Sequence, residues 1–432
     1  MKKICIIILL FTVFIASCKK EEEVPLTTDE AARDYLYEVM NDYYLWYKLM
    51  PDVVKDDYKD PYELMTAMRY TAIDRWSYVQ TYDEFLTIYH GSFVGHGIRF
   101  GLDPADKVRI VQVYKNSHLY SKGVRRGWIV KKINGTDLAP IFIAGDNAAY
   151  TRLIGPSEAG ITNTFLFQIP DGRDSTIIDT KSSFTLNTVI HYDTLNLKSG
   201  KTGYLVLDQF IPISNQELAT AFAFFKQENI LDLIVDLRYN RGGDLGVLAN
   251  MASYIAGSAK VNTPFLRLKY NDKHTADNEI YNFRSVASPL NLAKVIVICT
   301  RSTASASEDL INGLKPHMPV ICIGDTTEGK PVGMIGTSYK TDYMFWPIFY
   351  SIENSANQGD FYDGIAPDKY VPDDFTHDWD DRNELCLKEA IYYLEHGSVS
   401  PKSIYPYKLS RQFTEKPERF NDAIIINEPL NR

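Results

Sequence analysis

The sequence predicts an α/β protein with three folded parts: a small helical module, a β-rich domain and a larger core of strands and helices. Its 432 residues are too many for one small core, so more than one domain is expected. With 45% hydrophobic and 23% charged residues, the composition is that of a globular protein. Apolar strands alternate with helices over residues 191–400, which is typical of a mainly parallel sheet covered by helices.

The first 17 residues are expected to be a targeting segment. A basic start precedes an apolar run over residues 4–15, which is too short for a stable membrane-spanning helix. The Ile-Ala-Ser-Cys sequence that follows resembles a bacterial lipobox, which would make Cys18 a lipid-attachment site. A plain secretory signal with an incidental cysteine is the alternative. Residues 18–30 are expected to be a polar tether. We therefore expect a lipid-anchored protein of the cell envelope, attached to the outer membrane and facing either the periplasm or the cell surface.

Residues 31–85 are predicted to form the helical module. Thr28 or Asp29 could cap a first helix with apolar residues at helical spacing, and a second helix is expected over residues 61–70. This module would precede the β-rich domain.

Residues 86–190 are predicted to be β-rich, because residues 108–114 alternate in the manner of a strand and an Asn-Gly turn follows at 134–135. The region resembles a PDZ domain, although Gly127-Trp128 stands where members usually have Gly-Asp. The resemblance implies that a loop binds the C-terminal carboxylate of a peptide, which adds to the sheet as a strand. The loop residues would be Gly95, His96, Gly97 and Ile98. A generic small β-domain is the alternative.

Residues 191–400 carry the core, and residues 401–432 are a C-terminal extension. Ser214 and Glu217 form a predicted capping box at the start of one helix, and Gly257 is predicted to end another. Buried strands are expected at residues 203–207, 230–237, 295–299 and 320–323.

Charge and cysteine content exclude several classes of function. The formal net charge is −9 and no basic stripe is present, which argues against binding to nucleic acid. After the segment that ends at Cys18, the cysteines show no metal-ligand spacing and are odd in number, which argues against a disulfide framework. They are Cys299, Cys322 and Cys386, and the first two are expected to be packed core thiols. The sequence implies no metal or cofactor and leaves the oligomeric state open.

The first candidate for chemistry is Ser305, in the Thr-Ala-Ser-Ala-Ser-Glu segment at 303–308. It follows a buried strand and precedes a helix, which places it at the sheet edge where open α/β sheets keep their sites. The N–H groups at the start of that helix could stabilise an oxyanion. Alternatively, the serines of this segment only cap the helix.

Lys330 is the candidate base for that serine. It lies in a Glu-Gly-Lys-Pro segment, 25 residues after Ser305 and behind the apolar strand at 320–323. A lysine can take a serine proton only when desolvation disfavours its charged form. If the strands at 295–299 and 320–323 are neighbours, both loops open at the same sheet edge.

A third segment, Asp-Leu-Arg-Tyr-Asn-Arg-Gly-Gly at 236–243, also ends a buried strand and precedes a helix. Its glycines allow the backbone to approach a ligand closely, and its N–H groups could contribute to an oxyanion hole. The alternatives are a plain tight turn or a phosphate-binding loop, although neither the Walker A nor the GxGxxG spacing is present.

These three segments together resemble the C-terminal processing peptidases, the tail-specific proteases of serine peptidase family S41. The family's nucleophile falls on Ser305 and its general base on Lys330, and residues 363–368 resemble the family's Gly-Ile-x-Pro-Asp sequence. The resemblance implies a core of ClpP- or crotonase-like strand and helix layers and a Ser-Lys dyad. It also implies an oxyanion hole from the amides of Ala306, Gly242 and Gly243.

The chain departs from that family where the base is usually oriented. Many members have a glutamine four residues after the lysine, where this chain has Met334, which is expected to make no such hydrogen bond. Many also have an aspartate eleven residues after the serine, where this chain has Pro316. Thr337, Ser338 or a backbone carbonyl could substitute. Some relatives use a histidine base, for which the candidates are His96, His317 and His377.

The sequence therefore predicts an exported, lipid-anchored serine endopeptidase that acts on proteins or peptides, recognised by their C-terminal tails, through Ser305 and Lys330. Two other classes stay open. One is a non-catalytic, PDZ-type peptide-binding scaffold with a degenerate core. Met334 favours it, because this residue stands where many family members have the glutamine that orients the base. A small-molecule hydrolase such as an esterase is disfavoured because the G-x-S-x-G motif is absent.

Overall fold

The computed structural model describes residues 26–89, 92–401, 411–413 and 424–425. The predicted targeting segment, Cys18 and most of the tether and of the C-terminal extension lie outside these residues. Within the described ranges, no helix is both long enough and apolar enough to cross a membrane.

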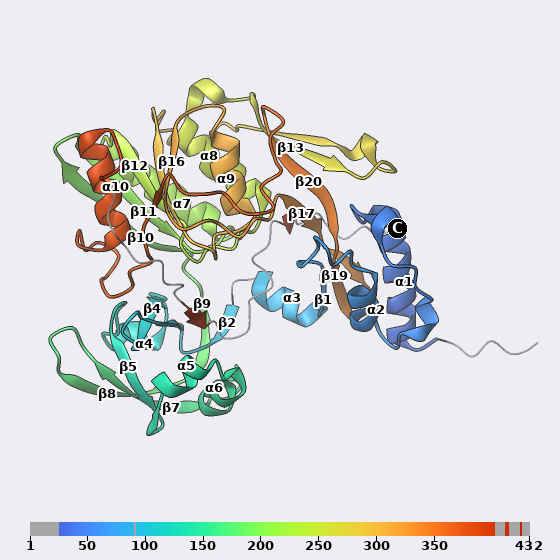
Figure 1. Ribbon diagram of the computed structural model, residues 1–432, viewed down its shortest axis with the longest axis horizontal. Coiled ribbons are helices and arrows are strands. Elements are labelled where there is room, and N and C mark those ends of the chain that lie inside the picture. Colours follow the sequence, from blue (N-terminus) through green and yellow to red (C-terminus); the bar gives the residue numbers. More distant parts are fainter. Residues whose placement is uncertain (1–25, 90–91, 402–410, 414–423, 426–432) are drawn as a thin grey trace, which may run out of the picture.

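A mainly parallel sheet forms the centre of the core, with strand order β10-β11-β12-β15-β16-β21 (Figure 1). β10 pairs antiparallel with β11, whereas the other neighbours pair in parallel. The expected pairing of the strand at 295–299 with that at 320–323 is confirmed, with Val295 opposite Val320. The strands are β10 Val189–Leu197, β11 Gly200–Leu207, β12 Asp232–Asp236, β15 Val295–Cys299, β16 Val320–Gly324 and β21 Lys369–Tyr370.

Helices cover both faces of this sheet. α7, α8 and α9 share one apolar cluster with Val235, whereas α10 packs in a second cluster with Ile234. Successive residues of a strand point to opposite faces, so β12 is buried on both sides. The helices are α7 Ser214–Gln227, α8 Leu245–Ala256, α9 Ala306–Leu314 and α10 Leu385–His396.

The predicted capping box at the start of α7 is wrong. Ile213 is the N-cap residue, and Ser214 is already the first residue of the helix. The Glu217 carboxylate instead accepts hydrogen bonds from Thr188 N (2.6 Å) and Val189 N (2.8 Å), so it fixes the start of β10. The prediction for α8 is confirmed, because Asp244 caps its start and Gly257 follows its last residue.

A second sheet has the order β14-β13-β20-β17-β23 and carries the segment after Lys330. Its pairs are antiparallel, apart from β17 with β23. β17 begins two residues after Lys330 and therefore extends from the candidate base. The strands are β13 Pro264–Tyr270, β14 Glu279–Asn282, β17 Val332–Ile335, β20 Ile348–Asn354 and β23 Ile424–Ile425.

The N-terminal module contains the two predicted helices, α1 (Thr28–Tyr43) and α2 (Pro61–Met68), followed by β1 (Tyr78–Thr81) and α3 (Tyr82–Tyr89). The first cap is Thr27 rather than Thr28 or Asp29, because Thr27 forms the capping box with Glu30. β1 belongs to a sheet of order β1-β19-β18, with β18 at Thr337–Tyr339 and β19 at Tyr343–Trp346. The module therefore shares a sheet with strands that follow Lys330 in the sequence.

The predicted β-rich domain lies below the core in Figure 1. Its main sheet has the order β22-β3-β4-β5-β7-β8, β6 pairs with β5, and β2 pairs with β9. Three helices, α4 His118–Ser121, α5 Ala139–Ala144 and α6 Asn147–Ile154, accompany these strands. The strands are β2 Ser92–Gly95, β3 Ile98–Leu102, β4 Val108–Val113, β5 Ile129–Ile133, β6 Thr136–Asp137, β7 Thr162–Gln168, β8 Asp174–Thr180, β9 Ser182–Thr185 and β22 Arg411–Phe413.

Candidate active site

Ser305 is the N-cap residue of α9 and is fully buried. Its backbone has φ 59° and ψ −122°, a conformation that costs a residue other than glycine about 1–3 kcal/mol. Its N–H donates to Glu308 Oε2 (2.8 Å), so a buried side chain of the same helix holds the turn in place. A serine on a strained turn between a strand and a helix is also how α/β-hydrolases present their nucleophile.

Lys330 is also fully buried, and its backbone N–H donates to the same oxygen, Glu308 Oε2 (2.8 Å). The other oxygen, Oε1, accepts from Gly329 N (2.7 Å) and Thr327 Oγ1 (2.5 Å). Burial raises the pKa of Glu308, and these hydrogen bonds act against that rise. One carboxyl group therefore joins the serine turn to the lysine loop.

Sequence reasoning assigned no role to Glu308, although a signal was present. A serine followed three residues later by a glutamate is the spacing of a capping box, which brings the glutamate back to the N-cap N–H. The bond from Glu328 N to Thr303 O (2.9 Å) is a second link between the two segments. The structure thus brings the predicted nucleophile and base loops together at one edge of the sheet.

The Lys330 amine lies near a sulfur atom and an aromatic ring. Its Nζ lies 3.7 Å from Met334 Sδ and 6.0 Å from the centroid of the Trp76 ring. A thioether sulfur is a weak acceptor, so the expectation that Met334 can make no hydrogen bond to the lysine is wrong. The Thr337 hydroxyl, suggested as a substitute, is buried and has no hydrogen-bond partner within the described residues.

The N-terminal module reaches this site, which the sequence did not predict. Trp76 lies near the lysine amine, and Arg75 Nη2 donates to Glu328 O (2.9 Å) in the lysine loop. The module therefore supports the candidate base directly. No short-range sequence pattern relates residues that lie some 250 positions apart.

The glycine turn packs directly on the serine turn. A Cβ on Gly242 would lie 2.9 Å from both Ala304 O and Ala306 N, and one on Gly243 would lie 2.1 Å from Phe210 O. The Gly242 N–H donates to Asn240 Oδ1 (2.8 Å) and is thereby committed within the turn. Three N–H groups were predicted to form the oxyanion hole. With that of Gly242 bound to Asn240, the N–H groups of Gly243 and Ala306 are the two that can serve as donors.

The three candidate histidines are hydrogen-bonded elsewhere. His96 binds Asp179 Oδ2 through Nδ1 (2.6 Å), His317 Nε2 contacts Ser355 Oγ (3.1 Å), and His377 Nδ1 contacts Asp374 Oδ2 (2.8 Å). None of these contacts connects a histidine to the serine or lysine turn, so the histidine route has no support here.

The predicted peptide loop is built around a buried residue. The His96 side chain points into the domain, where Nε2 contacts Asn163 Oδ1 (2.7 Å), so it is not presented to a peptide. Gly97 has φ 71°, and a Cβ there would lie 2.3 Å from the Ser117 Cβ, so this glycine allows close packing. Next to the loop, β3 pairs with β4 on one edge and with β22 on the other.

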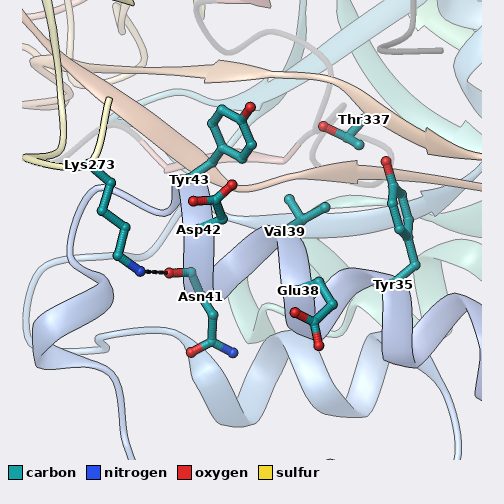
Figure 2. Close-up of a pocket in the computed structure, with 8 residues that line it drawn as sticks. All are labelled: Tyr35, Glu38, Val39, Asn41, Asp42, Tyr43, Lys273 and Thr337. Carbon is teal, nitrogen blue, oxygen red and sulfur yellow. Dashed lines mark hydrogen bonds between the residues drawn. The ribbon is translucent and has the colours of Figure 1, made fainter. Parts of the chain in front are cut away.

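A groove of about 460 Å³ lies against α1 (Figure 2). Figure 2 shows Lys273 Nζ donating to Asn41 O at its rim (2.6 Å). Neither Ser305 nor Lys330 lines it, whereas Thr337 does. Its lining residues are Tyr35, Glu38, Val39, Asn41, Asp42, Tyr43, Lys273 and Thr337.

The described residues contain no group of three or more His, Cys, Asp or Glu side chains placed to hold a metal ion. Cys299, Cys322 and Cys386 are buried free thiols, which confirms the core positions expected for the first two. The groups that the structure brings together at the sheet edge are the Ser305 hydroxyl, the Lys330 amine, the Glu308 carboxyl and backbone N–H groups.

Comparison with known sequences assigns the family. Residues 201–371 match the family model described as Peptidase family S41, and residues 31–78 match the Peptidase S41 N-terminal domain. The chain belongs to peptidase family S41. The first S41 match contains the glycine, serine and lysine turns, and the second covers the module whose Trp76 and Arg75 reach the lysine loop.

Known S41 sequences are distant relatives. The chain is 25% identical over 295 residues to a carboxyl-terminal-processing protease from Picosynechococcus sp., covering 65% of each chain. It is 23% identical over 347 residues to the chloroplastic carboxyl-terminal-processing peptidase 1 of Arabidopsis thaliana, covering 74% of this chain and 66% of that one. The chain thus spans slightly less than two thirds of the length of these relatives.

A solved structure supports the S41 fold. The crystal structure of an S41-type protein from Bacteroides fragilis aligns with a TM-score of 0.69 at 21% sequence identity. The alignment covers 86% of this chain and 98% of the other. The predicted α/β fold with a peptidase core is therefore confirmed.

Proposed function

We propose that this chain is a serine endopeptidase that cleaves protein substrates through a dyad of Ser305 and Lys330. The observation that carries the proposal is the Glu308 carboxylate, because one of its oxygens accepts the backbone N–H groups of both residues. Membership of family S41 supports the activity. The names of the relatives support substrates that are recognised at their C-terminal ends.

In the proposed reaction, Ser305 Oγ attacks the carbonyl carbon of the scissile peptide bond while its proton passes to the uncharged Lys330 amine. The N–H groups of Gly243 and Ala306 would stabilise the negative oxygen of the tetrahedral intermediate. The ammonium then returns the proton to the leaving amine as the C–N bond breaks. Water repeats the sequence on the acyl-enzyme and releases the product.

The β-rich domain is proposed to act as a PDZ-like domain that holds the substrate's C-terminal tail. β22 pairs antiparallel with β3, with Gln412 opposite Gly101, which supports the idea that this edge of β3 accepts a peptide strand. The adjoining loop, Gly95 to Ile98, would offer its backbone N–H groups to the carboxylate. A substrate ending in a free carboxylate should then be cleaved faster than the same peptide with a C-terminal amide, and equal rates would contradict this role.

The predicted lipid anchor at Cys18 is carried forward as part of the proposal. Its support is the basic and apolar leader followed by Ile-Ala-Ser-Cys. A fatty-acid label should be incorporated by the wild type and not by Cys18→Ala, and the variant should leave the membrane fraction. Equal labelling of both chains would show that the cysteine is incidental.

The peptidase proposal is tested by digesting a peptide library with purified protein. Ser305→Ala and Lys330→Ala should both lose cleavage, by about 10²-fold or more for the lysine variant, because the general base is removed. Ser302→Ala and Lys315→Ala are matched controls on neighbouring positions and should cleave normally. Cleavage by Ser305→Ala at the wild-type rate would overturn the proposal.

A non-catalytic peptide-binding scaffold is the second candidate, and Met334 at the position of the usual glutamine favours it. It predicts that peptides bind without turnover and that a serine-directed covalent probe leaves Ser305 unlabelled. The same preparation therefore separates the two functions.

A further inference from the structure

The C-terminal extension adds one edge strand to the β-rich domain and another to the core. Its first strand, β22, pairs antiparallel with β3 of the β-rich domain, with Gln412 opposite Gly101. Its second strand, β23, pairs in parallel with β17 of the core, with Ile424 opposite Met334. A single stretch of chain therefore covers a sheet edge in each of these two parts.

The edge of β17 that β23 covers lies beside the candidate base. The residue opposite Ile424 is Met334, whose sulfur lies 3.7 Å from Lys330 Nζ. The other edge of β17 pairs with β20. β23 also lies close to α8, the helix that follows the glycine turn at 242–243. β23 is thus next to both the strand that follows the base and the helix that follows the predicted oxyanion turn.

The edge of β3 that β22 covers is the one proposed above to bind the C-terminal tail of a substrate. β3 begins at Ile98, the last residue of the loop that would bind the carboxylate, and its other edge pairs with β4. The extension therefore occupies the proposed tail-binding edge and the edge beside the base at the same time.

Both edges can accept an extended peptide from another chain. An uncovered sheet edge presents unpaired N–H and C=O groups, with which an extended segment of almost any sequence can pair. β22 has three residues and β23 has two, which is short for a strand. Parallel pairing, as in β23, is also slightly less stable per residue than antiparallel pairing. The extension is therefore held by few backbone hydrogen bonds, and a longer peptide strand can displace it.

We propose that the C-terminal extension is, through β22 and β23, an internal competitor that keeps substrates from the edges of β3 and β17. The proposal rests on the proposed peptidase function, and it assigns the edge of β17 to the part of a substrate next to the bond that is cut. Because the extension is covalently attached, its effective concentration at these edges is on the order of millimolar. A substrate must displace it in order to bind, so the extension should raise KM. Saturating substrate displaces it completely, so kcat should be unaffected.

The order of the two strands indicates an inhibitor rather than a substrate. A protein held at β3 by its C-terminal tail would reach the dyad with residues that precede the tail. In the extension, the strand at β3 comes first in the chain and the strand at β17 comes later. The extension therefore covers the two edges in the reverse order, and we expect it to stay intact while a substrate is cut.

The first test compares KM for one cleavable peptide between the full-length wild type and two variants of β23. Ile424→Pro combined with Ile425→Pro removes both backbone N–H groups of the strand, so it can no longer donate to β17. Ile424→Val combined with Ile425→Val is the matched control, because valine keeps these N–H groups and also favours strands. The proline variant should have a KM lower by about fivefold or more and an unchanged kcat, whereas the valine variant should match the wild type. A KM that the prolines do not lower would overturn the proposal.

The second test measures binding and needs no cleavage. A fluorescent peptide with the sequence of residues 408–428 is titrated into full-length Ser305→Ala and into the same protein with the two proline substitutions. It should bind the second protein about fivefold more tightly or better, because the attached competitor no longer covers the edge of β17. A peptide that itself carries the two prolines should bind both proteins equally. Equal affinities of the unsubstituted peptide, or no binding to either protein, would overturn the proposal.

The two tests separate failure of this inference from failure of the proposed function. Ser305-dependent cleavage with an unchanged KM in the proline variant would overturn the competitor role and leave the peptidase in place. Cleavage that survives Ser305→Ala would overturn the peptidase proposal, and the binding test would still decide whether the extension competes for the edge of β17. Ser305-dependent loss of the extension from the wild type, seen by mass spectrometry, would show that it is a substrate and overturn the inhibitor role.

Discussion

Two buried polar clusters organise this chain, one around Glu308 in the core and one around His96 in the β-rich domain. Glu308 accepts hydrogen bonds from the backbone N–H groups of Ser305 and Lys330. His96 binds the side chain of Asp179 on a distant strand. A group that holds main-chain atoms fixes where reactive residues lie, whereas a group that holds a side chain ties strands together. The first cluster should therefore govern both activity and stability, whereas the second should govern stability alone.

Glu308→Gln should have the largest effect, because a donor amide would replace one acceptor oxygen and leave buried N–H groups unpaired. We expect a loss of about 10²-fold or more in kcat/KM and of about 2–4 kcal/mol in the free energy of unfolding. Glu389→Gln is the matched control, since Glu389 is also buried and accepts the Ser400 N–H (2.7 Å) far from the dyad. The account fails at this point if both variants keep wild-type kcat/KM.

Gly243→Ala and Gly95→Ala compare the two glycine loops. Gly243 has φ 136°, and its Cβ would lie 2.1 Å from Phe210 O, whereas the nearest atom to a Cβ on Gly95 is 3.9 Å away. Alanine at 243 should lower kcat/KM by about tenfold or more and destabilise the fold by more than about 1 kcal/mol, because the turn must move. Alanine at 95 keeps the backbone N–H that this loop would offer to a substrate carboxylate, so both quantities should be unchanged. Similar losses in both variants would contradict the assigned difference.

Asp179→Asn should affect stability without affecting the dyad. Burial acts to raise the pKa of Asp179. Hydrogen bonds from His96 and Lys122 outweigh that effect and hold this pKa below its usual range. At neutral pH, the free energy of unfolding of the variant should be lower than that of the wild type by about 1–3 kcal/mol. A carboxyl whose pKa is lower in the folded state stabilises the fold above its unfolded pKa, and this stabilisation disappears as the pH falls through its folded pKa. The difference in stability between the wild type and Asp179→Asn should therefore shrink below about pH 4. Urea titrations at several pH values measure it, and a loss that is constant with pH would refute the assignment.

Met334→Gln should have the smallest effect. An amide oxygen is a stronger acceptor than the sulfur that lies 3.7 Å from Lys330 Nζ, so the lysine should be held more firmly. We expect kcat/KM to rise by a few-fold, with little change in stability. A loss of tenfold would show that the thioether packing matters more than the hydrogen bond.

Part of this site was predictable from local sequence. Ser305 and Lys330 each follow a buried strand, and strands of that kind pair in parallel, so a shared sheet edge followed from the order of the elements. The β-rich domain and the two N-terminal helices followed from alternation and helical spacing. These inferences rest on residues close together in the chain, whose secondary-structure propensity and hydrophobic periodicity can be read from the sequence.

The remaining features depend on contacts between distant segments. Glu217 accepts a hydrogen bond from the backbone N–H of Thr188, in a distant segment, instead of capping its own helix. Asn240 occupies the Gly242 N–H, which motif matching alone cannot show. Trp76 lies near Lys330 and precedes β1, which pairs with β19. Glu308 looked like an ordinary residue of a helical first turn until its surroundings were known.

The most direct test of the Ser305–Lys330 dyad is the rate at which a fluorophosphonate probe labels Ser305, measured against pH and located by mass spectrometry. Labelling should occur at Ser305, rise with pH as Lys330 loses its proton, and fall by about 10²-fold or more in Lys330→Ala. An unlabelled Ser305, or a rate that is the same in the wild type and in Lys330→Ala at every pH, would contradict the account.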